Sequence, residues 1–258
     1  MPVYKTTFTP FEYSNTKNNI DKLKNSYDIC LLCPEKLNVS SLKTTFCCDF
    51  LIAAFPDKYF ISKESYSFLL EQPDFYKRFF AWEYMLIIQE DVFIFKDSTV
   101  LDEFIRYGYM YIGGPWTSEY CMRSAMKINS EMTGNGGLSL RNTKGLADML
   151  SKSEYKNLNL KTVEDQYISY MLYNEKVSCP VDISKKFSID NDYKFWHNRL
   201  NGDYPFGVHM GCVGSREYWQ DDIINESEKI IISLTSFGER LIFDVPRVID
   251  NIIKNMHS

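Results

Sequence analysis

Apolar and polar residues alternate along this chain in blocks whose spacing predicts strands and helices in turn. The clearest block is an uninterrupted apolar run over Tyr84–Ile88, which predicts a strand buried on both faces, as in a parallel sheet covered by helices. Earlier segments predict strands over 2–8 and 27–35, a helix over 11–25, and two helical pieces over 60–80. The chain therefore opens as a βαβ unit, and its pattern predicts an α/β protein.

After this strand the alternation continues. A short helix should end near Gly108, and residues 110–116 read as a strand that runs into a glycine and proline turn. The stretch 117–133 is polar and without clear period, which predicts a mobile loop. A strand is then expected over Leu138–Leu140, and helices over 143–150 and 162–175.

The last thirty residues change character after an acidic linker over 220–228. Residues 229–237 predict a strand, and 247–256 have a helical period. We therefore expect one domain over 1–226 and a separate segment over 227–258. That segment is either the start of a second module or an edge of the first domain.

Composition and charge exclude several classes of protein. A chain of 258 residues with 45% apolar content is folded, and a net charge of -5 argues against nucleic-acid binding, which needs a basic face. Seven cysteines without zinc-finger spacing are expected to be reduced and buried. No signal peptide and no apolar stretch of ~20 residues is evident, so we expect a cytoplasmic protein without a transmembrane segment.

Three groups of residues could carry chemistry. Glu90 and Asp91 end the apolar strand, at the sheet edge where α/β proteins bind ligands, so Asp91 could hold a divalent cation; two solvated acids would look the same. The glycines of GNGG over 134–137 permit close backbone approaches, although an ordinary hairpin turn would also use them. Glu164 and Asp165 begin a helix, where capping alone could explain both.

Taken together, the motifs resemble a known family. In order, these are TPFE, WEYMLIIQEDVFIF, YGYMYIGGPW, GNGGLSLRN, VEDQYIS and YPFGVHMG. The set is similar to that of a bacterial family of GT-A-type glycosyltransferases first catalogued as a domain of unknown function, and it spans about Pro2 to Gly211. Two residues depart from the family pattern: Glu90 replaces an apolar residue, and Gly211 stands where an aromatic residue is usual.

The resemblance implies a GT-A-like fold, with a mixed, mainly parallel central sheet flanked by helices. It implies that Asp91 and His209 bind Mn²⁺ or Mg²⁺ beside the donor diphosphate, since both ions favour oxygen ligands and Mn²⁺ tolerates imidazole. Asp165 would be the general base and Glu164 its acceptor-binding partner, or the reverse.

The remaining implied contacts concern the two substrates. Nucleotide contacts are expected from Pro2, Val3, Tyr4, Gln89 and Glu90. Sugar contacts are expected from Trp116, Asn135, Gly136 and Gly137, although Trp116 could equally be a core residue.

The sequence thus predicts a metal-dependent, inverting glycosyltransferase. Its donor would be a nucleotide sugar, a UDP-sugar first, and its acceptor a glycan or glycoconjugate in cell-surface polysaccharide synthesis. It would work at the inner membrane face only through other domains or partners. Two alternatives stay open: a noncatalytic carbohydrate-binding or scaffolding module, and a nucleotidyltransferase, for which TTFTPFE is a poor match because it lacks a glycine-rich phosphate loop.

Overall fold

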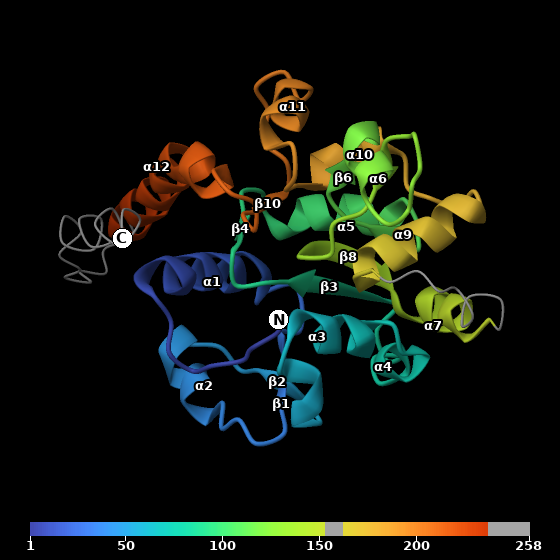
Figure 1. Ribbon diagram of the computed structural model, residues 1–258. Helices are drawn as coiled ribbons and strands as arrows, with labels where there is room; N and C mark the ends of the chain where they lie inside the picture. The colour runs from blue at the N-terminus through green and yellow to red at the C-terminus, as the bar shows by residue number, and fades with distance from the viewer. Residues whose placement is uncertain (153–161, 237–258) are drawn as a thin grey trace.

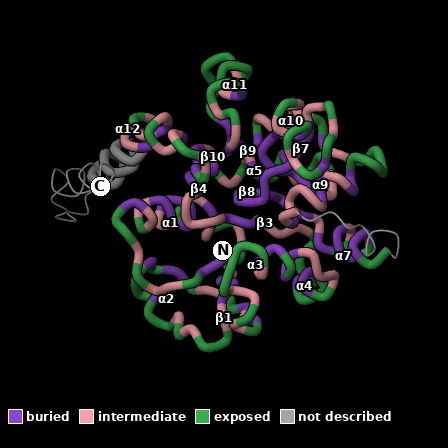
Figure 2. Tube along the Cα trace, in the orientation of Figure 1, coloured by how far each residue is buried: buried purple, intermediate pink, exposed green. Residues whose placement is uncertain are grey.

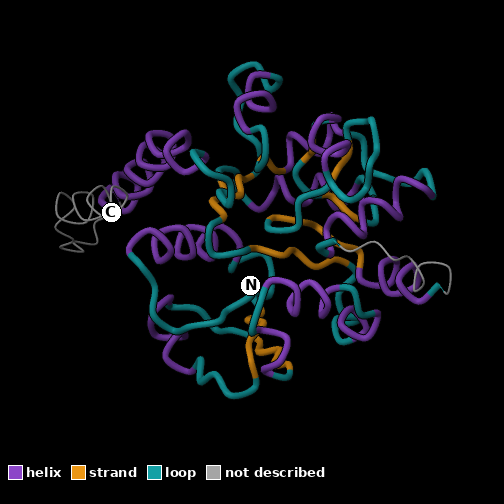
Figure 3. The backbone as a smooth tube through the Cα atoms, viewed as in Figure 1, coloured by secondary structure: helices purple, strands orange, loops and turns teal. Residues whose placement is uncertain are grey.

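The computed structural model describes the backbone over residues 1–152 and 162–236, with side chains in the last helix described up to residue 226. Most strands lie in the middle of the molecule among the helices, while the strands over 30–34 and 51–55 lie in its lower part in this view (Figure 1, Figure 3). Buried residues concentrate in these central strands and in the helix faces that pack on them (Figure 2). Among the described residues, no helix is both long and apolar enough to cross a bilayer.

The described helices and strands are these, in chain order. The helices are α1 (Pro10–Leu23), α2 (Ser40–Phe46), a 3₁₀ turn (Asp57–Phe60), α3 (Lys63–Leu70), α4 (Pro73–Lys77), α5 (Ser98–Arg106), α6 (Ser118–Arg123), α7 (Thr143–Ser151), α9 (Glu164–Asn174), α10 (Val181–Phe187), α11 (Tyr193–Asn198) and α12 (Ser215–Ser236). The strands are β1 (Cys30–Pro34), β2 (Leu51–Phe55), β3 (Tyr84–Ile88), β4 (Val92–Ile94), β5 (Tyr111–Ile112), β6 (Pro115–Trp116), β7 (Met132–Thr133), β8 (Leu138–Asn142), β9 (Ser188–Ile189) and β10 (Gly207–His209).

The helical period of apolar residues in the sequence predicts most of the described helices correctly. Helices α1, α3, α4, α5, α7 and α9 lie where the pattern predicts them, and the 60–80 stretch divides at Pro73. Local signals explain this success: Thr9 and Glu12 form a capping box at the start of α1, and Gly108, with φ of 73°, follows the end of α5.

Strand pairing differs from the expectation of a mainly parallel sheet. β3 pairs with β8 and β8 with β5, both antiparallel, as are the β4–β10 and β6–β7 pairs; β1–β2 and β9–β10 are parallel. β3 is also not buried on both faces throughout, because its first three residues are only half-buried. An apolar run predicts a strand but carries no information about the direction of its partner.

Three further segments correct the sequence reading. Residues 2–8 form only a single bridge, Pro2 to Leu32, because the chain turns away to cap α1 at Thr9. The expected loop over 117–133 contains α6, which Thr117 caps, and β7, which pairs with β6 directly before this segment. The expected strand over 229–237 is helical as far as Ser236, since α12 continues through it; the predicted helix over 247–256 lies outside the described residues.

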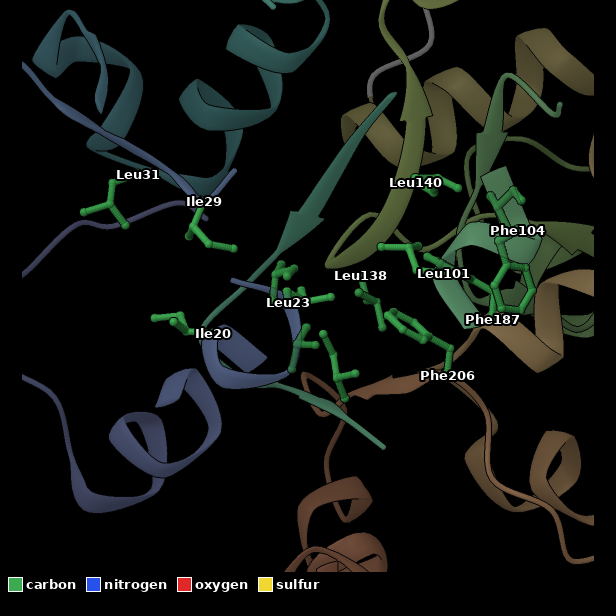
Figure 4. Close-up of a cluster of buried hydrophobic side chains, with 14 of the residues drawn as sticks. Ile20, Leu23, Ile29, Leu31, Leu101, Phe104, Leu138, Leu140, Phe187 and Phe206 are labelled. Carbon is green, nitrogen blue, oxygen red and sulfur yellow. The ribbon is translucent and has the colours of Figure 1, made fainter. Parts of the chain in front are cut away.

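The main core joins α1 to the central strands and α5. Ile20 and Leu23 of α1, Leu138 and Leu140 of β8, and Leu101 of α5 are all nearly fully buried in it (Figure 4).

Two hydrogen bonds of the Asn19 side chain attach α1 to β4, the strand that follows the predicted metal ligand Asp91. The side-chain amide of Asn19 donates to the carbonyl of Val92 (2.7 Å) and accepts from the amide of Ile94 (2.9 Å). Buried amides satisfied in this way hold β4, and with it the preceding Asp91, in a defined position.

Candidate active site

Asp91 and His209 meet because two short strands pair in one register. β4 and β10 are antiparallel with His209 opposite Val92, and the amide of Met210 donates to the carbonyl of Asp91 (3.0 Å). The carboxylate Oδ1 of Asp91 consequently lies 3.1 Å from Nε2 of His209. Residues 118 positions apart in the sequence thus form one partly buried pair.

The imidazole of His209 is held on its other side as well. Its Nδ1 lies 3.0 Å from Oδ1 of Asn135 and 3.4 Å from Oδ1 of Asp190. Burial alone would lower the pKa of His209, but hydrogen bonds and charges from Asp190 and Asp91 raise this pKa to about 10. Burial opposes ionisation of Asp91, yet its hydrogen bond to His209 holds its pKa below the ordinary value. Asp91 and His209 therefore share a proton at the position where a metal cation could bind.

The glycine segment over 134–137 fills the space between this pair and the acids of α9. A Cβ on Gly137 would lie 2.4 Å from Cε1 of His209, and a Cβ on Gly136 would lie 2.7 Å from Oε1 of Glu164. No side chain fits at either position, so the glycines are required by close approach. The segment places His209 and the acidic pair on two sides of one turn.

Glu164 and Asp165 have different surroundings although they are adjacent. Glu164 is 7% exposed; it accepts from the guanidinium of Arg141 (2.9 Å) and from the hydroxyl of Ser67 (3.3 Å). Asp165 is half-buried and accepts from the amides of Gly136 (3.1 Å) and Gln166 (2.7 Å). Glu164 therefore forms a buried ion pair with Arg141, whereas Asp165 is bonded by backbone amides alone.

The pKa of Asp165 is suited to a base. Burial, and next the charge of Glu164, raise this pKa from its usual value to about 6. A carboxyl group with that pKa is ionised at neutral pH and still accepts a proton more readily than a free aspartate.

Residues 49–209 match the protein family described as Protein of unknown function (DUF5672). The chain belongs to this family. A search of curated proteins finds no match.

Three solved structures similar to this DUF5672 protein are glycosyltransferases. Mouse xyloside xylosyltransferase 1, apo form, has 9% identity and a TM-score of 0.56, covering 82% of this chain and 96% of its own. The galactosyltransferase LgtC, in complex with donor and acceptor sugar analogs, has 12% identity and a TM-score of 0.57, covering 88% and 94%. WbbM, a bifunctional glycosyltransferase in its apo structure, has 13% identity and a TM-score of 0.54, covering 88% and 49%. The likeness confirms the α/β, GT-A-like fold.

Of the N-terminal residues of the DUF5672 chain, Tyr4 lies near the site and Val3 lies in the core. The ring of Tyr4 is 41% exposed and packs edge-on against Phe60 and Tyr66. Burial, and then the charges of nearby carboxylates led by Glu90, raise the pKa of Tyr4, so its hydroxyl lies near the acids. Val3, by contrast, is 6% exposed in the core, and its side chain is not available to a nucleotide.

The turn between β3 and β4 carries the two remaining expected nucleotide contacts. The amide of Gln89 donates to the carbonyl of Gly137 (2.9 Å), which ties this turn to the glycine segment. Glu90 is half-buried, and its carboxylate lies 3.8 Å from the ammonium of Lys5.

Trp116 lies in the core of the DUF5672 protein. It is 1% exposed and packs in a cluster with Cys121, Met126 and Met132. A Cβ on Gly134 would lie 2.2 Å from Cε3 of its ring. The indole packs against the glycine segment and has no free face for a sugar. Of the two alternatives for Trp116, the structure therefore supports a core residue.

Sequence reasoning missed two buried charged residues at this site. Asp190 is 3% exposed; it accepts from the amide of Asn135 (2.6 Å) and lies beside His209. Arg141 is fully buried and bonds Glu164, Ser139 and the hydroxyl of Tyr76. The available signals were the acid-amide-acid triplet at 190–192 and an arginine inside the apolar strand LSLRN.

The donor atoms present fit a divalent cation that also binds phosphate. Asp91 and His209 present an oxygen and a nitrogen donor 3.1 Å apart, and Mn²⁺ accepts both kinds of ligand. Asn135 and Asp190 orient the imidazole from its other nitrogen, as second partners of metal-bound histidines do. The described residues hold no cluster of three or more such ligands, so substrate oxygens and water would complete the shell.

Gly137→Ala is expected to displace the imidazole and weaken cation-dependent nucleotide binding by about 10–100-fold, as changes around metal ligands do. Gly114→Ala is the matched control, because its Cβ would meet its nearest atoms at 3.5 Å, an ordinary contact. Titration calorimetry with UDP and Mn²⁺ measures both variants. Equal affinities in the two would show that the close approach at Gly137 does not position His209.

Proposed function

We propose that this protein is a metal-dependent glycosyltransferase that moves a sugar from a nucleotide-sugar donor to a hydroxyl of a glycan or glycoconjugate. One observation carries the proposal: a single glycine turn touches His209 of the candidate cation pair with Gly137 and Asp165 with Gly136. A transferase of this kind needs a cation at the departing diphosphate and a base at the attacking hydroxyl. The turn contacts both His209, which would hold the cation, and Asp165, which would be the base.

On the donor side, Asp91 and His209 would hold Mn²⁺ or Mg²⁺. When bound, the ion neutralises charge that develops on the diphosphate leaving group. Arg216, the second residue of α12, contributes to the lowered pKa of Asp91, so its positive charge lies near this pair and can attract phosphate oxygens. The hydroxyl of Tyr4 and the side chains of Gln89 and Glu90 would contact the nucleoside.

On the acceptor side, Asp165 would take the proton from the acceptor hydroxyl as it attacks the sugar carbon. The amides of Gly136 and Gln166 orient its carboxylate, and each oxygen retains a lone pair for the acceptor. The ion pair of Glu164 with Arg141 fixes the start of α9 and thereby the position of Asp165. A base facing the acceptor in this way supports an inverting transfer. The donor we propose is a UDP-sugar, and the product a cell-surface polysaccharide.

The test is nucleotide binding that requires the cation. We expect UDP with Mn²⁺ to raise the thermal unfolding midpoint, EDTA to abolish the shift, and a matching UDP-sugar to be hydrolysed slowly. The rise should correspond to about 2.7 kcal/mol at a ligand concentration 100 times its dissociation constant. Indifference to every nucleotide tested would contradict the proposal and favour a noncatalytic module.

Asp91→Asn should remove the stabilisation by UDP and Mn²⁺ while leaving the unliganded protein folded, because one cation ligand loses its charge. Asp148→Asn, on the exposed face of α7, is the control and should keep the full shift. Differential scanning fluorimetry with and without EDTA compares the two. A full cation-dependent shift in Asp91→Asn would remove Asp91 from the proposed ligand set.

A further inference from the structure

Tyr120 lies beside the candidate active site, on the short helix α6. The hydroxyl of Thr117 caps this helix by accepting from the amide of Tyr120 (3.3 Å), and the same hydroxyl donates to Asp192 (2.7 Å). These two bonds attach α6 to the segment that follows β9. The side chain of Tyr120 is half-buried, so part of it remains open to solvent.

The ring of Tyr120 packs on the indole of Trp116. The ring centroids are 5.2 Å apart with 30° between the planes, and Tyr120 also packs against the other buried members of this cluster, Cys121, Met126 and Met132. Because Trp116 is 1% exposed, the side of this aromatic pair that a sugar can reach belongs to Tyr120. An aromatic ring with one supported face offers the apolar surface on which a sugar ring can pack.

Gln166 connects the hydroxyl of Tyr120 to the proposed base. The side-chain amide of Gln166 donates to this hydroxyl (3.1 Å), and the backbone amide of Gln166 donates to Oδ1 of Asp165 (2.7 Å). The side-chain oxygen of Gln166 accepts from the hydroxyl of Thr162, so its NH₂ group is the end that faces Tyr120. One residue thus holds the carboxylate and the phenol in a defined relative position.

The hydroxyl of Tyr120 has a proton to donate to a ligand. It accepts from Gln166, and within residues 1–152 and 162–236 no group accepts from it. Burial, and then the charges of Asp165 and Asp190, raise the pKa of Tyr120 above its ordinary value, while the hydrogen bond from Gln166 opposes them. The phenol therefore stays protonated at neutral pH, and both carboxylates are near enough for their charges to act on it.

The carboxylates around this hydroxyl leave a negative charge. Asp190 shares His209 with Asp91, and Asp165 is bonded by backbone amides alone. These charges would repel an anionic group on a sugar. Uncharged hydroxyls can instead use the donor of Tyr120 and the acceptor oxygens of Asp165.

We propose that Tyr120 binds the acceptor and selects an uncharged sugar over a uronic acid. Its ring would pack on the sugar, and its hydroxyl would donate to an oxygen next to the attacking hydroxyl. Gln166 is the positioning residue, because it sets the phenol relative to Asp165, so that a sugar held by Tyr120 presents its attacking hydroxyl to the base. This inference rests on the proposed glycosyltransferase function and adds the class of acceptor to it.

The test measures transfer to methyl glycosides in Mn²⁺, with whichever of UDP-glucose, UDP-galactose and UDP-N-acetylglucosamine the parent protein hydrolyses. We expect kcat/KM for methyl glucoside or methyl galactoside to exceed that for methyl glucuronide about tenfold or more, because like charges repel. Tyr120→Phe should raise the KM for the neutral glycoside about 3–10-fold, as loss of one hydrogen bond does. Its kcat, its donor hydrolysis and its affinity for UDP should stay at the parent values.

Tyr170→Phe is the matched control. Tyr170 packs against the same buried cluster from α9, and removal of its hydroxyl should leave the KM for the glycoside unchanged. The inference is overturned if Tyr120→Phe keeps the parent KM, if Tyr170→Phe raises it equally, or if methyl glucuronide is used as well as the neutral glycosides. A parent protein that hydrolyses the donor but transfers to neither neutral glycoside also overturns it.

Failure of the proposed function gives a different result. A parent protein without cation-dependent UDP binding and without donor hydrolysis would contradict the glycosyltransferase function itself, and with it the acceptor site. The binding assay contains no acceptor, so it separates this outcome from a wrong role for Tyr120.

Discussion

Asp165→Asn is expected to bind nucleotide and cation as the parent protein does, while glycosyl transfer falls by about 10²–10⁴-fold. The amide cannot take a proton from the acceptor, but it keeps the size of the carboxylate, and its one oxygen can still accept from one of the two amides that bond Asp165, those of Gly136 and Gln166. The measurement is transfer rate together with UDP affinity in the presence of Mn²⁺. Asp148→Asn on the exposed face of α7 is the control for removal of one negative charge.

Two outcomes would contradict the assignment of Asp165. Full transfer activity in Asp165→Asn would show that the base is another group. Equal loss of nucleotide binding and transfer would show that Asp165 acts on the donor side and not on the acceptor.

The pH profile of the parent protein gives a second measure of the same group. Since the pKa of Asp165 is raised to about 6, transfer should fall about tenfold for each pH unit below 6 as the base becomes protonated. The sign for stability is opposite to that for activity. A folded-state pKa above the unfolded value contributes stability below about pH 4, and this contribution is lost as the pH rises through about 6.

Arg141→Met is expected to lower the free energy of unfolding by about 3–5 kcal/mol, the largest effect on stability that we predict. Arg141 is fully buried, and its removal leaves Glu164 as a buried charge without its partner. Urea denaturation of parent and variant measures the difference. Tyr76 and Ser139 would lose bonds to the guanidinium in the same variant, which adds to the cost.

The double variant Arg141→Met with Glu164→Gln separates the cause. Removing both charges should recover much of the lost stability, because no uncompensated ion remains. Arg123→Met is the matched control, since its pair with Glu119 is exposed and should contribute little. If the double variant were as unstable as Arg141→Met alone, packing and not charge would account for the loss.

The candidate site could be predicted from the sequence only in part. Asp91, Gly137 and Asp165 each follow or begin an element that local spacing predicts, so their positions at element ends were readable from the chain. Val3 was expected to contact the nucleotide from the first strand, and Trp116 to contact a sugar or to lie in the core; both are buried. Burial of an aromatic or β-branched residue depends on packing from distant segments, which motif order does not contain.

What the sequence determined by itself is the α/β class, most helices, and the delivery of acids and glycines to the ends of elements. These follow from the period of apolar residues, from caps and from glycine conformation, all of which act within a few residues. Tertiary structure alone decided that β8 pairs antiparallel with β3, that β10 brings His209 to Asp91, and that Arg141 neutralises Glu164. Each of these depends on contacts between residues far apart in the chain, where the free energy of packing and pairing selects one partner among many that the local pattern allows.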